Sequence, residues 1–371
     1  MTQLVGTAES AVVEGADTAP VAPPPPAPLR GLQQHATALR LGGSLLAVIL
    51  GLAFASMAGS YYVFVGAQFF AFVIVTLSLN LLFGYGAQIV IAQGAVVGLG
   101  AYSFAIMVRH GVHPIPAAVA AVLFTMLSSL VVALPALRLE GLYLGIATLA
   151  FQFGLSGLFA AWDAVTGGQQ GLALPQVQGA HGPFNNDQFW FVVSGIGALL
   201  VLLGTGRFVR GSGGRAMAAL RQSVYAAQTL GLRPVRWRML IFAISGAMSG
   251  LAGVLLAGQI AFVSPASYST DRTLLFFLAV IVGGVRSVAG SVLGALVAVV
   301  LPQLLALLGY TDNESLIFAA LMIVALITLP DGLVTLPRRL AALPSRLASL
   351  RGSRRAAFAD NGSQEVGHDG K

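Results

Sequence analysis

Long apolar runs separated by short polar segments dominate this chain from residue 41 onward. A helix of roughly 20 mostly apolar residues crosses the ~30 Å hydrocarbon core of a bilayer. The pattern predicts about ten transmembrane or re-entrant helices, of which the third and eighth are the weakest because they are rich in glycine or short. The expected spans are 41–58, 61–83, 88–108, 116–134, 141–161, 189–205, 238–260, 272–284, 288–308 and 314–330.

The composition indicates that lipid, rather than water, surrounds most of the chain. It is 57% hydrophobic and only 9% charged, whereas soluble domains contain about 25% charged residues. We therefore predict an all-α polytopic membrane protein. The chain has no cysteine, which excludes disulfides and thiolate chemistry.

The net charge of +7 comes mainly from two segments beside expected spans, 206–237 and 338–371. Basic segments in such places set membrane orientation, so we do not expect nucleic-acid binding. The first segment has six arginines and no acidic residue, whereas the preceding loop, 162–188, has no Lys or Arg. This asymmetry predicts that 206–237 and both termini are cytoplasmic. The two weak spans are third in each half, which fits an inverted five-plus-five repeat.

The chain divides into a membrane domain, residues 41–332, and two polar ends. Residues 1–40 are rich in proline and lack a signal-peptide pattern, so we expect a disordered cytoplasmic arm. Residues 333–371 form an expected basic cytoplasmic tail. Within 206–237, the stretch 215–230 lacks Gly and Pro and predicts a helix, or two short helices broken near Ser223. Its apolar stripe consists of Met217, Leu220, Val224 and Ala227.

Catalytic chemistry is missing from the expected spans. No acidic, histidine or cysteine pair has metal-ligand or acid-base spacing, and no Gly-Lys-Ser/Thr phosphate loop occurs, so we expect neither a metal nor an ATP site. An ion-driven carrier usually keeps ionisable residues inside the membrane, and none is apparent. The polar residues of the spans are mostly neutral, and they serve either to hold helices together or to line a solute path. The path candidates are Asn80, Gln88, Gln93, Thr148 and Gln152.

Several blocks between about residues 79 and 332 resemble the permease subunits of ABC importers for branched-chain amino acids, specifically the longer of their two permeases. Each block is weak alone, but their order and spacing together are specific. The blocks are Leu79-Asn80-Leu-Leu-Phe-Gly84-Tyr85, Arg138-Leu-Glu-Gly141-Leu-Tyr143, Thr166-Gly167-Gly168-Gln-Gln-Gly171, Gly214-Arg215-Ala216, Ala226-Ala227-Gln-Thr-Leu-Gly231, Phe262-Val-Ser264-Pro265, Gly283-Gly284 and Pro330-Asp-Gly332.

The resemblance implies a subunit of the bacterial inner membrane that is not itself an enzyme and binds no cofactor. It implies a second permease, two ATPase subunits that use ATP, and an extracytoplasmic solute-binding protein as partners. The residues expected to couple the chain to an ATPase subunit are Arg215, Arg221, Ala226, Ala227 and Gly231. The loop expected to face the binding protein contains Trp162, Thr166, Gly167, Gly168 and Gly171.

Departures from the family pattern keep alternatives open. Gln222, Val224 and Gln228 stand where the coupling motif usually has acidic residues, so docking should depend less on charge. Val90 and Gln93 replace the usual Ser and His near the expected path, so an importer of urea or short amides is an alternative. A stand-alone secondary carrier or channel is a more distant one.

Overall fold

The computed structural model describes residues 59–139, 141–175, 186–307, 320 and 332–335. The expected span 41–58, the arm 1–40 and nearly all of the span 314–330 and of the tail lie outside this part of the chain. The long helices are α2 (Ser60–Asn80), α3 (Gln93–Arg109), α4 (Pro114–Ala136), α5 (Leu142–Ala161), α7 (Asn186–Arg210), α10 (Pro234–Ile260), α11 (Thr270–Gly283) and α12 (Val288–Leu307).

The predicted all-α polytopic class is confirmed. Six helices of the described residues are long and apolar enough to cross a membrane, while the count of ten stays a prediction. The two weak spans correspond to α3, with 17 residues, and α11, with 14 residues. At 1.5 Å per residue they are about 25 Å and 21 Å long, which is shorter than the ~30 Å hydrocarbon core. A π-helical turn, η1 (Leu81–Tyr85), and an irregular link precede α3.

The core of the membrane domain is formed by α2, α3 and α10. The buried share of the apolar window is 61% in α2 and 67% in α10, compared with 28% in α5 and α7, so the latter two are peripheral. Glycine allows α3 and α10 to approach closely, since a Cβ on Gly100 would lie 2.7 Å from the Cα of Gly250. Peripheral helices expose apolar side chains such as Leu127, Phe153 and Leu200, as expected for surfaces that face lipid or another membrane subunit.

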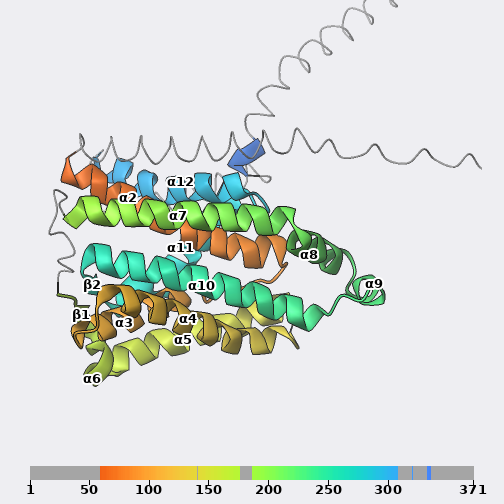
Figure 1. The fold of residues 1–371 in the computed structure, drawn as a ribbon, viewed down its shortest axis with the longest axis horizontal. Coiled ribbons are helices and arrows are strands. Elements are labelled where there is room, and N and C mark those ends of the chain that lie inside the picture. Colours follow the sequence, from red (N-terminus) through yellow and green to blue (C-terminus); the bar gives the residue numbers. More distant parts are fainter. Residues whose placement is uncertain (1–58, 140, 176–185, 308–319, 321–331, 336–371) are drawn as a thin grey trace, which may run out of the picture. The chain divides into compact units, whose positions relative to one another are not determined.

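The short elements gather at the two ends of the long helices (Figure 1). One end carries α8 (Ser212–Gln222) and α9 (Val224–Thr229). The other carries α6 (Asp163–Thr166), the turn η2 (Gly168–Gln170) and two strands, β1 (Leu172–Ala173) and β2 (Phe262–Val263). These strands pair antiparallel, with Leu172 opposite Val263. The segments expected to meet the ATPase and the binding protein therefore lie at opposite ends of the described helices.

Candidate functional site

The expected coupling segment consists of two short helices, as the sequence predicts, with the break at Ser223. This residue is extended (φ −158°, ψ 119°), and its hydroxyl accepts a hydrogen bond from the amide of Ala226, which starts α9. Gly231 ends the pair at φ +80°. Within the predicted loop 206–237, α7 continues to Arg210 and α10 begins at Pro234.

The apolar stripe of this segment packs against the chain's own helices. Met217 and Ala227 are buried, with 3% and 2% of their surfaces exposed. Met217 belongs to the main hydrophobic core, and Leu220 packs against that core. The surface that remains for a partner is instead α9 and the residues after it, where Tyr225 is 84% and Leu230 is 78% exposed.

The five predicted coupling residues have different environments. Arg215 and Ala226 are exposed, and Gly231 lies on the exposed turn after α9. Arg221 anchors the segment, because its guanidinium Nη1 donates a 2.6 Å hydrogen bond to the carbonyl oxygen of Gly84 in η1. Ala227 lies on the buried side of α9, with 2% of its surface exposed.

The loop expected to face the binding protein is compact because glycine allows its backbone to turn sharply. Gly167, Gly168 and Gly171 all have positive φ, a region that only glycine adopts readily. A Cβ on Gly171 would overlap the carbonyl oxygen of Val263 in β2. The Thr166 hydroxyl donates a 2.7 Å bond to the carbonyl of Phe159 and holds α6 against α5.

Among the residues of this loop, Trp162 is half exposed and available to a partner. The glycine pattern is thus explained by backbone geometry alone. We conclude that Trp162 is a candidate contact, whereas the three glycines shape the loop.

Gln152, a predicted path residue, is fully buried and links four elements. Its Oε1 accepts hydrogen bonds from the amide of Ala95 in α3 (2.8 Å) and the hydroxyl of Thr273 in α11 (3.0 Å). Its Nε2 donates to the carbonyl of Tyr268 in the turn η3 (Pro265–Tyr268) at 2.9 Å. Burial raises the pKa of the Tyr268 phenol, because it disfavours the charged form.

Gln93 lies at the centre of a second buried network that joins α2, α3 and α10. Its Nε2 donates to the hydroxyls of Ser78 (2.9 Å) and Ser249 (2.6 Å). Ser78 is also 2.7 Å from the hydroxyl of Ser245. Because these side chains are hydrogen-bonded to one another, the network holds α2, α3 and α10 together in the described conformation.

Asn80 and Thr148 also have partners. Asn80 donates to the carbonyl of Ser287 (2.9 Å) and the hydroxyl of Ser291 (2.7 Å), and its Oδ1 accepts from the amide of Arg286 (2.9 Å). The hydroxyl of Thr148 accepts from the amide of Ile91, in the link before α3, at 2.9 Å. Both side chains fasten irregular backbone to helices.

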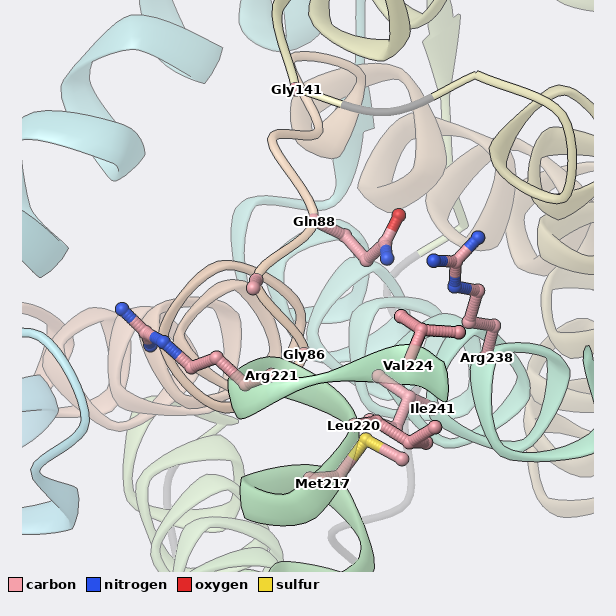
Figure 2. Close-up of a pocket in the computed structure, with 10 residues that line it drawn as sticks. Gly86, Gln88, Gly141, Met217, Leu220, Arg221, Val224, Arg238 and Ile241 are labelled. Atoms are coloured by element: carbon pink, nitrogen blue, oxygen red, sulfur yellow. The ribbon is translucent and has the colours of Figure 1, made fainter. Parts of the chain in front are cut away.

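Gln88, the fifth path candidate, lines a cavity. The cavity has a volume of about 220 Å³ and lies between the α2–α3 link, α8 and α10. Gln88 is 7% exposed, and its Oε1 accepts no hydrogen bond among the described residues. Figure 2 shows its amide and the guanidinium of Arg238 pointing toward one another. The structure therefore places Gln88, a predicted path residue, in the wall of a cavity.

Sequence reasoning missed several residues of these networks. The partners Ser78, Ser249 and Thr273 lie in apolar helices and are fully or almost fully buried, and their only signal is a hydroxyl within a span. Arg238 was missed because an arginine at the start of a span resembles an ordinary topology signal. It donates a 3.3 Å hydrogen bond to the carbonyl of Ala136 at the end of α4.

Comparison with known proteins extends these observations. The chain is similar to the high-affinity branched-chain amino acid transport system permease protein LivM of Salmonella typhimurium, with 29% identity over 71% of this chain and 67% of the relative. It is also similar to the permease LivH of the same organism, with 28% identity over 48% of this chain and 61% of the relative. No solved structure matches the chain.

A shorter similarity reaches the autoinducer 2 import system permease LsrC of Yersinia enterocolitica, with 29% identity over 32% of this chain and 33% of the relative. The family model described as "Branched-chain amino acid transport system / permease component" matches residues 61–326. This match covers nearly all of the described helices, including both candidate end surfaces. The resemblance in the sequence is thereby confirmed: the chain is a multi-pass membrane protein that belongs to the branched-chain amino acid transport system permease family.

Proposed function

We propose that this chain is the permease of an ABC importer for branched-chain amino acids, powered by two ATPase subunits on separate chains. A second permease and an extracytoplasmic solute-binding protein complete the assembly. The observation that carries this proposal is the pair α8–α9, which exposes Tyr225 and Leu230 at one end of a family-typical membrane domain. The chain itself binds no ATP or other cofactor and acts as the gate.

The distribution of charge supports a cytoplasmic position for α8–α9. The arginines at their end of the described helices are Arg138, Arg207, Arg210, Arg215, Arg221, Arg233, Arg236, Arg238 and Arg286. The described acidic residues, Asp163, Asp187 and Asp271, begin helices at the opposite end. By the positive-inside rule the α8–α9 end faces the cytoplasm, and the loop with Trp162 faces the binding protein.

The contacts of α8–α9 suggest how motion would be transmitted. Arg221 ties α8 to the carbonyl of Gly84, and Met217 packs in the core formed with the membrane helices. A partner that binds Tyr225 and Leu230 would therefore move α8 and α9, which are attached to both α2 and α10. Such rigid-body transfer between a docked helix and packed helices is a common way to switch between two states.

The test replaces the exposed side chains of this surface with alanine in the assembled transporter, reconstituted in vesicles. The double variant Tyr225→Ala, Leu230→Ala should lower solute transported per ATP hydrolysed by at least about tenfold, since exposed aromatic anchors dominate interfaces. Tyr62→Ala is the matched control, because Tyr62 is 61% exposed at the opposite end. A double variant with wild-type coupling and assembly would contradict the proposed docking surface.

The same vesicles identify the solute. Labelled leucine should accumulate in the compartment that contains the ATPase subunits, and only when ATP and the binding protein are both present. Accumulation of urea instead of leucine would show that urea, rather than a branched-chain amino acid, is the transported solute. Accumulation of either solute by the chain alone, driven by a proton or sodium gradient, would refute the proposal that the chain is the permease of an ABC importer.

A further inference from the structure

Two adjoining cavities form a groove between α7 and α10, at the end of these helices that carries α8 (Figure 1). The two helices approach closely near the middle of α7, where a Cβ on Gly197 would lie 3.5 Å from Cδ1 of Leu255. Toward α8 the space between them is unfilled, and the two cavities there have volumes of about 460 Å³ and 290 Å³. Gly204 and Phe208 line both cavities, so a single elongated molecule can extend from one into the other.

The cavity nearer to α8 has a basic and polar lining. Arg207 belongs to α7, Ser212 begins α8, and Trp237 lies in the first turn of α10. The Arg207 side chain is exposed, and it forms no hydrogen bond or ion pair with the described residues. A guanidinium group can donate two parallel hydrogen bonds to a phosphate group. A tryptophan ring is typical of the boundary between lipid headgroups and acyl chains.

The second cavity has an almost entirely apolar lining. Its walls come from η1, α7 and α10, and Thr205 is the polar residue among them. The residues that line it are Leu81, Val201, Gly204, Thr205, Phe208, Ile244 and Met248. Burying a polar group in such a lining without a hydrogen bond is unfavourable, whereas burying a hydrocarbon chain is favourable. The groove is therefore amphipathic along its length, with a basic part at the α8 end and an apolar part beyond it.

The exposed surface of α7 connects this groove to the surrounding lipid. Ile196, Leu200 and Leu203 are exposed, and they lie three or four residues apart, so they form one apolar stripe that continues to Arg207. Arg207 lies about 32 Å along α7 from Asn186 at 1.5 Å per residue. Because the hydrocarbon core is ~30 Å thick, this length places the guanidinium group at the level of the headgroups.

The charge at this end of the helices favours a negatively charged headgroup. Arg210 follows Arg207 by one turn, Arg236 precedes Trp237, and all three arginines are exposed. The described acidic residues begin helices at the opposite end. Each arginine near a membrane surface strengthens the binding of an anionic lipid roughly fivefold.

We propose that the groove between α7 and α10 binds one anionic phospholipid. The lipid phosphate accepts hydrogen bonds from Arg207 and from the hydroxyl of Ser212, the glycerol backbone lies beside Trp237, and one acyl chain enters the apolar cavity. A zwitterionic phospholipid binds more weakly, because its ammonium group offsets the charge of the phosphate. The bound lipid fills the space between α7, the start of α8 and α10, and it thereby stabilises their arrangement. The inference depends on the membrane location of the chain and not on the solute that it transports.

Native mass spectrometry of the purified full chain, freed of endogenous lipid by exchange into a neutral detergent, measures the binding. Dioleoyl-phosphatidylglycerol should bind at one saturable site, about fivefold or more tightly than dioleoyl-phosphatidylcholine, which has no net charge. Glycerol 3-phosphate, which lacks acyl chains, should not bind at the same concentrations. Added phosphatidylglycerol should also raise the temperature of half-unfolding in the same detergent, which provides a second measurement.

The basic part of the groove is tested by removing its cation. Arg207→Gln should weaken the binding of phosphatidylglycerol by about fivefold and remove most of the preference over phosphatidylcholine. Arg138→Gln is the matched control, because Arg138 is an exposed arginine at the same end that follows α4 and does not line the groove. It should retain the wild-type affinity.

The apolar part of the groove is tested by filling it. Gly204→Leu should weaken the binding of phosphatidylglycerol by about tenfold or more, which corresponds to the loss of about two buried methylene groups. The change should leave the fold intact, because a Cβ on Gly204 would meet no atom within 4 Å. Gly206→Leu is the matched control, since Gly206 also lies on α7 and faces open space but does not line either cavity. It should bind phosphatidylglycerol like the wild type.

Several results would overturn the lipid site. Equal affinities for the two phospholipids, or equal effects within either pair of variants, would show that the lipid does not bind in this groove. Glycerol 3-phosphate that binds as tightly as phosphatidylglycerol would identify a site for a free phosphate instead of a lipid. Loss of phosphatidylglycerol binding in the assembled transporter would show that another subunit covers the groove. None of these results affects the proposed function, which the uptake of leucine tests.

Discussion

Replacing Gln152 by leucine tests whether the buried polar residues hold helices together or contact the solute. The substitution preserves size and removes all four hydrogen bonds of the amide, to Ala95, Thr273, Tyr268 and Ser156. The amide of Ala95 lies in the first turn of α3, where a helix offers no backbone acceptor. The hydroxyl of Thr273 can turn to the carbonyl of Ser269, 3.4 Å away.

The loss of stability follows from the groups that remain unpaired. The amide of Ala95 and the carbonyl of Tyr268 stay buried without a partner, at about 1–3 kcal/mol each. Hydrogen bonds between side chains in membrane proteins average about 0.6 kcal/mol, so the four bonds give roughly 2 kcal/mol by that measure. We therefore expect Gln152→Leu to lower the free energy of unfolding by about 2–6 kcal/mol.

Equilibrium unfolding of the detergent-solubilised protein with increasing SDS measures this change. Ser156→Ala is the matched control, because it removes only the 3.2 Å bond to Gln152 and should cost less than about 1 kcal/mol. A Gln152→Leu protein within about 0.5 kcal/mol of wild type would refute the structural role. If that variant kept its stability and lost leucine uptake, the residue would belong to the solute path.

Two further substitutions test helix contacts. Gly100→Ala should destabilise the protein by about 1–3 kcal/mol, because the new methyl group would overlap the backbone of α10. Gly157→Ala is the control and should be neutral or stabilising, because its methyl group would enter open space. The midpoint of unfolding in SDS measures the stability of both variants. Arg221→Ala removes the hydrogen bond to the carbonyl of Gly84 and should weaken the attachment of α8 by about 1–3 kcal/mol. The weaker attachment should appear as faster amide hydrogen exchange in α8. Arg215→Ala, at an exposed site, is the control and should leave the exchange rate unchanged. Equal effects within either pair would contradict the packing described here.

The features that the sequence predicts well are those set by local patterns. Apolar length predicts the membrane helices, and the polar Ser223 between two helical stretches predicts the break in the expected coupling segment. The weak third and eighth spans are short helices because their sequences contain glycine and polar residues close to the apolar run. Each of these properties depends on neighbours within a few turns of the chain.

The features that the sequence predicts poorly depend on contacts between distant residues. The apolar stripe of α8 has the same pattern whether it faces a partner or its own core, and only the fold shows that Met217 is buried. The bond between Arg221 and Gly84 joins residues 137 positions apart. The strands β1 and β2 have two residues each, which is too short for an alternating pattern to identify them.

The helix α10 has a mechanical consequence for the whole membrane domain. Its 27 residues run without interruption from Pro234, just after α9, to Ile260, just before β2, a length of about 40 Å. Because β2 pairs with β1, the loop that contains Trp162 is fastened to the end of α10 that lies farther from α9. A tilt of α10 imposed at the end that carries α8 and α9 would therefore also displace the loop that contains Trp162.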